Sequence, residues 1–349
     1  MLRPTPAMMN RRHFLRTAGS ATALAALSAQ TSPAAEPPTG GAQAQPNQFA
    51  TMKLEGDRLL IETHTLRAEM THGLLTSLRS RLTGEEFIRS LEKPGAAALE
   101  LIYRGDEIVR VDTSKFGSIT THLLSDRQAE IVFHSWDGDG VITVSVDPDS
   151  GDILVEPSAY SSRPGVRGCR WNLTGLRAEL ELVAPFFQGV RLKLEDTLVR
   201  NTHWAWPFFW EAGLAILQGA QGGFWVHTQD PRYRYKAIQV GSSTDPHRIG
   251  FDTEAYGPID QNLGAGGLAW RINVFPGDWT VPAERYREWL WRAYQLQPDE
   301  ASRPGWIRDV RFAVSWCPGA PEVLEALARR LDPRHVLIHF PNWRTDTYD

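Results

Sequence analysis

The sequence predicts a mainly β protein in which an antiparallel sandwich precedes one amphipathic helix and a short alternation of strand and helix. Three observations support this fold class. Short apolar or alternating runs, separated by Gly, Asp and Asn turns, fill residues 49–275, as in all-β sandwiches. Apolar residues spaced by three and four then mark a helix from Ala283 to Tyr294. A strand–helix–strand pattern occupies residues 306–349.

The expected strands of the sandwich lie between turn signals. The clearest are residues 59–63, 66–70, 74–82, 99–103, 119–123, 129–133, 141–146, 177–183 and 190–198. Asp137-Gly138 and Ser150-Gly151 are hairpin-type dipeptides. The acidic residues around them could suggest calcium, but turn chemistry explains them as well, so no metal and no cofactor is predicted.

The helix after the sandwich is expected to connect two domains, over residues 276–305. Pro282 suits a first turn because its missing N–H has no helical partner to lose, and Glu284 places a carboxylate near the positive helix start. Tyr286 and Trp289 lie on one face and need a large surface to bury them. The alternative is a surface helix of a single domain.

Composition limits the classes of function. The chain has 349 residues, a net charge of −4 and no basic stripe, so nucleic acid is not an expected partner. Thirteen Trp, fourteen Phe and eight Tyr suit a carbohydrate-active protein, because the C–H face of a sugar packs on a flat ring, although most of these rings should be core. Cys169 and Cys317 are expected as buried free thiols, with a disulfide as the alternative.

The N-terminus predicts export. Residues 10–16, Asn-Arg-Arg-His-Phe-Leu-Arg, match the twin-arginine pattern, and the apolar run 17–29 is too short to span a bilayer. Ala-Gln-Ala at 42–44 is a plausible cleavage site, so residues 1–44 are interpreted as signal peptide and linker. No Cys lies near this site for a lipid anchor. We therefore expect a periplasmic or secreted protein, exported folded by the twin-arginine machinery, with no membrane anchor after signal removal.

The segment 203–240 is the most informative part of the sandwich. It holds five aromatic residues in 204–210 and then the run Gly-Gly-Phe-Trp-Val-His-Thr-Gln-Asp-Pro at 222–231. A strand whose polar end leaves the sheet can present Trp225, His227 and Asp230 to a ligand. The alternative is that the rings fill the sandwich and Asp230 begins a turn.

Four segments together resemble a known family: 185–190 (Pro-Phe-Phe-Gln-Gly-Val), 222–231, 277–289 with its Gly-Asp-Trp and Tyr-Arg-Glu-Trp, and 341–343 (Pro-Asn-Trp). Over about residues 50–349 the chain resembles bacterial secreted glycoside-hydrolase-like proteins, which are similar to endo-α-N-acetylgalactosaminidase and, more distantly, to α-galactosidase. The resemblance implies a galactose-mutarotase-like β-supersandwich over 49–275, a helical connector over 276–305 and a (β/α)8 catalytic barrel that begins at 306.

The barrel is expected to be incomplete. Residues 311–316, 321–331 and 335–340 fit its first strand, helix and second strand, whereas a closed barrel needs about 250 residues. Only the first βαβ unit of a truncated barrel is therefore expected. The resemblance places the catalytic carboxylates on later strands, so no catalytic residue is assigned and enzyme activity is left open.

Functional residues of such barrels follow the C-terminal ends of the strands. This rule selects Trp316 after the first strand, and Trp343, Arg344, Asp346 and Asp349 after the second. We expect them to shape a sugar subsite by stacking and hydrogen bonding. The alternative is that the two Trp side chains only cap the barrel.

The sequence thus predicts the N-terminal carbohydrate-recognising part of an exported glycoside hydrolase-like protein, not catalytic on its own, whose partner is an oligosaccharide or polysaccharide. The alternatives are a stand-alone exported glycan-binding protein and a mutarotase-like sugar epimerase. The epimerase needs a His and a carboxylate that face each other in one cleft. Its candidates are His203, His227, Glu211 and Asp230.

Overall fold

The fold is described from a computed structural model of the chain. The described residues are 49–88, 97–111, 117–134, 138–187, 189–196, 200–241, 245, 247–254, 258–296, 303–315, 317 and 320–340. They divide into two compact units, one that extends to Trp289 and one that begins at Leu290. Within the described residues, every helix is too short or too polar to cross a bilayer.

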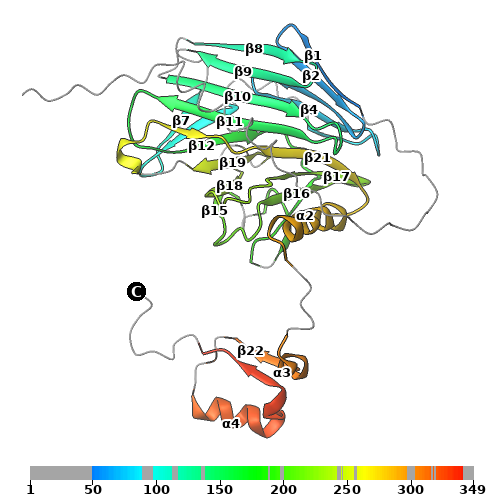
Figure 1. The fold of residues 1–349 in the computed structure, drawn as a ribbon, viewed down its shortest axis with the longest axis vertical. Coiled ribbons are helices and arrows are strands. Elements are labelled where there is room, and N and C mark those ends of the chain that lie inside the picture. Colours follow the sequence, from blue (N-terminus) through cyan, green and yellow to red (C-terminus); the bar gives the residue numbers. More distant parts are fainter. Residues whose placement is uncertain are drawn as a thin grey trace, which may run out of the picture. The chain divides into compact units, whose positions relative to one another are not determined.

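Three antiparallel sheets build the first unit (Figure 1). The five-stranded sheet has the order β1 (Ala50–Glu55), β2 (Arg58–Thr63), β3 (Leu66–Thr71), β4 (Leu74–Ser80), β5 (Glu86–Ile88). The ten-stranded sheet has the order β14 (Val190–Lys193), β13 (Glu181–Ala184), β16 (Leu214–Gln218), β17 (Gly222–His227), β21 (Trp270–Pro276), β11 (Ile153–Ser161), β10 (Gly138–Val146), β9 (Gln128–His134), β8 (Ser118–Ser125), and β20 (Gly264–Gly266) also pairs with β11. The six-stranded sheet has the order β15 (Thr202–Ala205), β18 (Lys236–Val240), β19 (Ile249–Glu254), β12 (Val166–Leu173), β6 (Leu99–Tyr103), β7 (Ile108–Val111).

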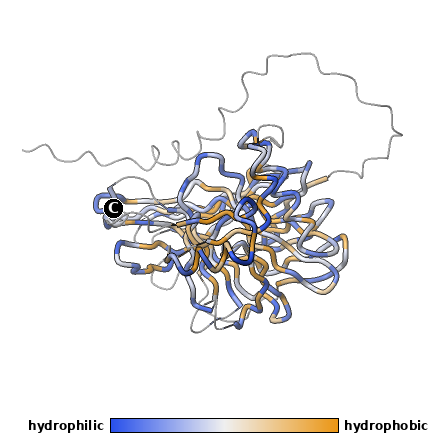
Figure 2. The backbone as a smooth tube through the Cα atoms, turned by 90° about the horizontal axis from the view of Figure 1, so that it is seen from below, coloured by the Kyte–Doolittle hydropathy of each residue, from blue (hydrophilic) through white to orange (hydrophobic). Residues whose placement is uncertain are grey.

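One hydrophobic core joins all three sheets. At its centre the Trp270 ring lies 6.2 Å from Trp210 and 5.0 Å from Phe251. Strand β11 shows the underlying pattern, because its odd-numbered residues are buried while its even-numbered residues are only partly buried. Hydrophobic stretches run through the strands and hydrophilic ones mark many turns (Figure 2). The ten-stranded sheet therefore has one core face and one outer face.

Helix α2 (Thr280–Ala293) covers part of this outer face beside β17 (Figure 1). It begins three residues before the predicted start, and the Thr280 N–H donates to the Asp278 carboxylate over 2.9 Å. Tyr286 is buried: its hydroxyl accepts the Gly213 N–H over 3.1 Å, and its ring meets His227 edge-on at 6.0 Å. The predicted amphipathic helix is confirmed, and its aromatic face binds the sheet.

In its described residues, the second unit holds one parallel pair of strands. Its elements are α3 (Gly305–Asp309), β22 (Phe312–Val314), α4 (Pro321–Arg330), η3 (Pro333–His335) and β23 (Val336–Ile338). Phe312 pairs with Val336 in parallel, and α4 forms the crossover. The strand–helix–strand prediction is confirmed for the described residues, with shorter strands than expected. The truncated barrel itself stays a prediction.

Cys169 and Cys317 are both buried and carry free thiols in this structure. Burial, with the negative charge of Asp252, raises the pKa of the Cys169 thiol. The expected burial of both residues is confirmed, and Cys169 behaves as an unreactive core residue.

Replacing Tyr286 by Phe should destabilise the first unit by about 1–3 kcal/mol, because the buried Gly213 N–H loses its acceptor. Urea denaturation followed by far-UV circular dichroism measures the change. The exposed Trp291 provides the control, and Trp291→Phe should stay within about 0.5 kcal/mol of the parent. Equal stability of the Tyr286→Phe variant and the parent would show that this contact does not anchor α2.

Candidate functional site

The structure buries all three predicted ligand residues of the segment 222–231, Trp225, His227 and Asp230. Trp225 and His227 stack on the outer face of β17 with ring centroids 3.7 Å apart, and they are only 4% and 1% exposed. Tyr286 of α2 closes over His227. The expectation that this strand end leaves both rings open to a ligand is therefore wrong for this structure, because α2 covers them. A ligand role for them stays a prediction.

His227 is neutral in this environment. Its Nε2 lies 3.9 Å from the Asp152 carboxylate, and neither ring nitrogen has a hydrogen-bond partner among the described residues. Burial lowers the pKa of His227 to about 3; the Asp152 charge opposes this effect and the Arg271 charge adds to it. The Asp152 carboxylate is held by Arg271 at 2.7 Å and Asn273 at 2.6 Å. His227 therefore acts as a packing residue under α2.

Asp230 organises the loop that follows β17. Its carboxylate accepts the backbone N–H of Arg232 over 3.1 Å and that of Arg234 over 2.9 Å, and it lies 3.4 Å from the Lys236 ammonium. Burial alone would raise the pKa of Asp230, but the Arg234 charge and these hydrogen bonds hold it below its ordinary value. The turn that was the alternative interpretation is present, and the ionised carboxylate fixes it.

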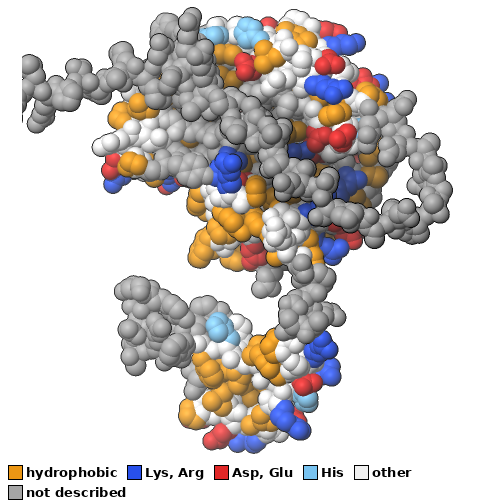
Figure 3. All heavy atoms as spheres, viewed as in Figure 1, with side chains coloured by type: hydrophobic (Ala, Val, Ile, Leu, Met, Phe, Trp, Pro, Cys, Tyr) orange, Lys and Arg blue, Asp and Glu red, His pale blue; other side chains and the backbone are white. Residues whose placement is uncertain are grey.

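The aromatic cluster at 204–210 divides between core and surface. Trp210 is fully buried, whereas Phe208 is exposed. Trp204 packs against Phe187 and Phe209 with edge-to-face geometry at 5.3 and 5.4 Å. Hydrophobic side chains are prominent on the lower part of this unit in the space-filling view (Figure 3). The cluster thus serves partly as core, as the alternative interpretation expects.

Five predicted site residues lie outside the described part of the chain. They are Trp316, Trp343, Arg344, Asp346 and Asp349. Their assignment to a sugar subsite stays a prediction.

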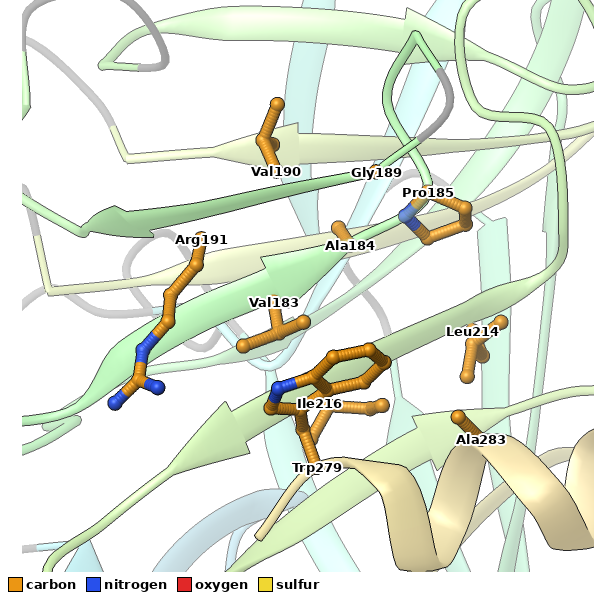
Figure 4. A pocket seen from close by; sticks show the side chains of 10 residues that line it. All are labelled: Val183, Ala184, Pro185, Gly189, Val190, Arg191, Leu214, Ile216, Trp279 and Ala283. Atoms are coloured by element: carbon orange, nitrogen blue, oxygen red, sulfur yellow. The ribbon is translucent and has the colours of Figure 1, made fainter.

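A recess of about 390 Å³ lies beside α2 on the outer face of the ten-stranded sheet (Figure 4). It is lined by Val183, Ala184, Pro185, Gly189, Val190, Arg191, Leu214, Ile216, Trp279 and Ala283. Trp279 of α2 and Ile216 of β16 both line this recess, and Arg191 is held by the Glu181 carboxylate at 2.6 Å. Because the lining is otherwise apolar, this recess offers no acid–base group.

The strongest polar arrangement lies on the outer face of the six-stranded sheet. The imidazole Nε2 of His203 on β15 lies 2.9 Å from the Asp252 carboxylate on β19. Strand β18 runs between them, and its residue in register with Asp252 is Ala237. Because that side chain is a single methyl group, the His203 ring can cross β18 and reach Asp252.

Asp252 is fully buried and fixed by a two-pronged ion pair. Arg170 donates from Nε and Nη2 to its two carboxylate oxygens over 2.5 and 2.8 Å. Burial alone would raise the pKa of Asp252, but the Arg170 charge and hydrogen bonds, aided by His203, hold it below its ordinary value. Glu100 lies 3.5 Å from Arg170 and 3.2 Å from Arg248. The ionised Asp252 therefore orients the His203 ring.

Glu254 lies two residues beyond Asp252, on the same face of β19. Its side chain is 11% exposed and 3.7 Å from the Arg167 guanidinium, and it accepts no hydrogen bond from the described residues. Burial raises the pKa of Glu254; Arg167 and His203 oppose this effect. The His203 side chain is 33% exposed. An oriented imidazole and an unsatisfied carboxyl thus lie together, able to bind hydroxyl groups and to exchange protons.

Both predicted His candidates for an epimerase have a carboxylate neighbour from outside the predicted set. His203 pairs with Asp252 at 2.9 Å, and His227 lies 3.9 Å from Asp152. The alternation in Phe-Asp-Thr-Glu at 251–254 signals two carboxyl groups on one strand face, and this signal could have found Asp252 and Glu254. In the described ranges, no group of three His, Cys, Asp or Glu side chains could hold a metal ion.

No protein-family model matches the sequence, and no curated protein matches it. Among solved structures, the α-N-acetylgalactosaminidase NagBb from Bifidobacterium bifidum matches in its GalNAc complex with a TM-score of 0.52, 12% identity, and coverage of 85% of this chain and 52% of that chain. Its ligand-free form matches with a TM-score of 0.52, 14% identity, and coverage of 85% and 53%.

A galactose mutarotase-like protein from Lactobacillus casei ATCC 334 matches with a TM-score of 0.39, 12% identity, and coverage of 62% of this chain and 100% of that chain. The chain spans about half the length of NagBb. The likeness to NagBb shows a glycoside-hydrolase-like fold, and the strands show that this fold is mainly β here.

The neutral state of His227 predicts a pH-dependent stability. Its folded pKa of about 3 lies below the ordinary 6.5, so its contribution is fully present above pH 6.5 and is lost as the pH falls towards 3. Each pH unit in this window should remove up to about 1.4 kcal/mol, because the unfolded chain binds one more proton. Urea denaturation of the parent and of His227→Gln at pH 7 and pH 5 measures the difference. The parent should lose more stability than the variant; parallel losses would contradict the assignment.

Proposed function

We propose that this chain is the carbohydrate-recognising part of an exported glycoside hydrolase-like protein, and that its first unit binds a sugar on the outer face of the six-stranded sheet. One observation carries the proposal: the Asp252-oriented His203 ring and Glu254, a carboxyl that accepts no hydrogen bond in the described structure, lie on one face of the sheet on either side of Asp252. The glycoside-hydrolase-like fold supports the ligand class, because NagBb of similar fold is known in complex with GalNAc.

The chemistry of the site suits sugar hydroxyl groups. Each hydroxyl is both a donor and an acceptor, so it can donate to Glu254 and accept from a remaining N–H of Arg167, whose partly exposed guanidinium also holds the Asp106 carboxylate at 2.6 Å. The exposed Tyr235 lies on the segment beside β19, where its backbone carbonyl accepts the Glu254 N–H over 3.2 Å. An apolar C–H face of a sugar can pack on such a ring.

Recognition fits this site better than hydrolysis of a glycosidic bond does. Hydrolysis uses two carboxyl groups, one as acid and the other as nucleophile or base. Asp252 is fully buried and both of its oxygens are engaged by Arg170 and His203. Asp106 is a second accessible carboxyl near Glu254, but the Arg167 guanidinium holds it at 2.6 Å. Among the described residues, Glu254 is therefore the one accessible carboxyl of this site without an ion pair at hydrogen-bond distance.

Interconversion of sugar anomers is the second candidate function, favoured by the presence of both an imidazole and a carboxyl. One group would take the proton of the anomeric hydroxyl while the other gives a proton to the ring oxygen, which opens the ring without net loss of protons. Reclosure on the other face and return of both protons completes the cycle.

Sugar binding should depend on the two accessible groups. His203→Ala and Glu254→Gln should each weaken binding of glycans that end in galactose or N-acetylgalactosamine at least fivefold, measured by glycan array and calorimetry. His247→Ala is the matched control, because His247 is a comparably exposed histidine that pairs with Glu195 elsewhere. Binding that is unchanged in both site variants would reject this site.

The same variants separate the two functions. Polarimetry follows the relaxation of freshly dissolved α-D-galactose. If the chain only recognises sugars, the rate should equal that of buffer; acceleration that disappears in Glu254→Gln would instead establish anomer interconversion.

Export by the twin-arginine pathway is part of the proposal and is supported by the residue pattern at 10–16 and the apolar run at 17–29. Replacing Arg11 and Arg12 together by Lys should abolish the appearance of processed protein in the periplasm, measured by cell fractionation. Arg16→Lys is the control and should still be exported. Normal export of the double variant, or export by a host without the pathway, would contradict this part.

A further inference from the structure

Strand β11 changes its partner halfway along its length. Ile153–Val155 pair with β21, whereas Ser158–Tyr160 pair with β20, so Glu156 and Pro157 lie at the change. Residues 267–269, which join the two partner strands, leave the ladder, and the Gly267 N–H donates to the Pro157 carbonyl over 3.2 Å. Gly266 permits this approach, because an added Cβ would lie 2.4 Å from the Ser158 Cα. The sheet is therefore interrupted beside Glu156.

Glu156 points to the outer face of the ten-stranded sheet. Its neighbours along the strand, Val155 and Pro157, are buried, while Glu156 and Ser158 are partly buried on the opposite side. Thr143 on β10 is its register partner on this face. Among the described residues the Glu156 carboxyl accepts no hydrogen bond, and burial raises its pKa against the opposing charge of Arg234. A partly buried carboxyl in this state is open to donors from solvent or from a ligand.

Arg234 is fixed at the same interruption. Its Nε donates to the Asp230 carboxylate over 3.2 Å, and its Nη1 donates to the carbonyl of Gly267, the residue bonded to Pro157. These bonds use two of the five N–H donors of the guanidinium. The side chain is 24% exposed, so the remaining donors have access to solvent. Asp230 is thus a positioning residue for Arg234.

We propose that Glu156 and Arg234 form a second sugar-binding site, which holds two adjacent hydroxyl groups of a neutral sugar ring. Glu156 accepts the proton of one hydroxyl, and Arg234 donates to the oxygen of the next. The hydroxyls of Thr143 and Ser158 flank Glu156 on the same face. The ligand class rests on the proposed function, whereas the location does not, because this site lies on a different sheet.

A neutral ligand fits this pair better than an acidic one. Arg234 already carries the Asp230 carboxylate as its counter-ion, so an acidic sugar would bring a further negative charge next to Glu156. A single carboxyl is also too few ligands for a hard cation, which takes six or more oxygens. A neutral diol satisfies both groups without adding charge.

The test uses the full chain with His203→Ala and Glu254→Gln combined, so that the first proposed site is removed. Frontal affinity chromatography on the immobilised protein measures retention of neutral galacto-oligosaccharides and of oligogalacturonates. The double variant should still retain the neutral sugar. Adding Glu156→Gln or Arg234→Ala to it should lower the affinity at least fivefold. Glu130→Gln is the matched control, because Glu130 lies on the same face in register with Thr143. It should leave retention unchanged.

Each other outcome overturns the proposal. Unchanged retention of the neutral sugar after Glu156→Gln is added would reject the site. Absence of retention in the double variant alone would reject it as well. Glu156→Gln is nearly isosteric, and an unchanged melting temperature shows that the variant is folded. Stronger retention of the oligogalacturonates would overturn the ligand class. If only the His203 and Glu254 changes abolish binding, the first proposed site stands and this second site is rejected. If only the Glu156 change abolishes binding, this second site stands and the first is rejected.

Discussion

The ion pair between Arg170 and Asp252 is the constraint on which the six-stranded sheet and its outer face depend. The two residues are register partners on β12 and β19, and both side chains are almost completely buried. Because an unpaired buried charge costs several kcal/mol, a slip of one strand past the other would be strongly unfavourable. The pair thus fixes the register of two strands and holds the His203 ring through Asp252.

The same principle of paired charges governs the loop after β17. Asp230 is buried, yet its carboxylate accepts hydrogen bonds from the Arg234 guanidinium and from two backbone N–H groups, which compensate its charge. In both places a buried carboxylate is fully engaged and positions a second group that reaches the surface. The buried anions therefore provide structure, while the groups that they position, His203 and Arg234, are available for ligands.

Much of the fold could be predicted from local pattern. Strands β9 and β10 alternate between buried and partly buried residues, and both were predicted at nearly the observed positions. Strands β12 and β16 were not predicted, because they are buried on both faces and show no alternation. The burial of Trp225 and His227 could not be predicted either, since it depends on α2 folding back over β17 from more than fifty residues later.

The candidate sites show why sequence alone falls short for function. His203 could be named from the sequence, but its orientation depends on an Asp252 carboxylate that is fixed by Arg170, 82 residues away. Alternation along β11 places Glu156 on a polar face, yet only the change of partner strand near residue 267 shows that it lies at an interruption of the sheet, where no described residue donates to its carboxyl. Local pattern determines which face a polar side chain occupies. Long-range pairing determines which of those side chains is already satisfied, and the unsatisfied ones are those that remain to bind a ligand.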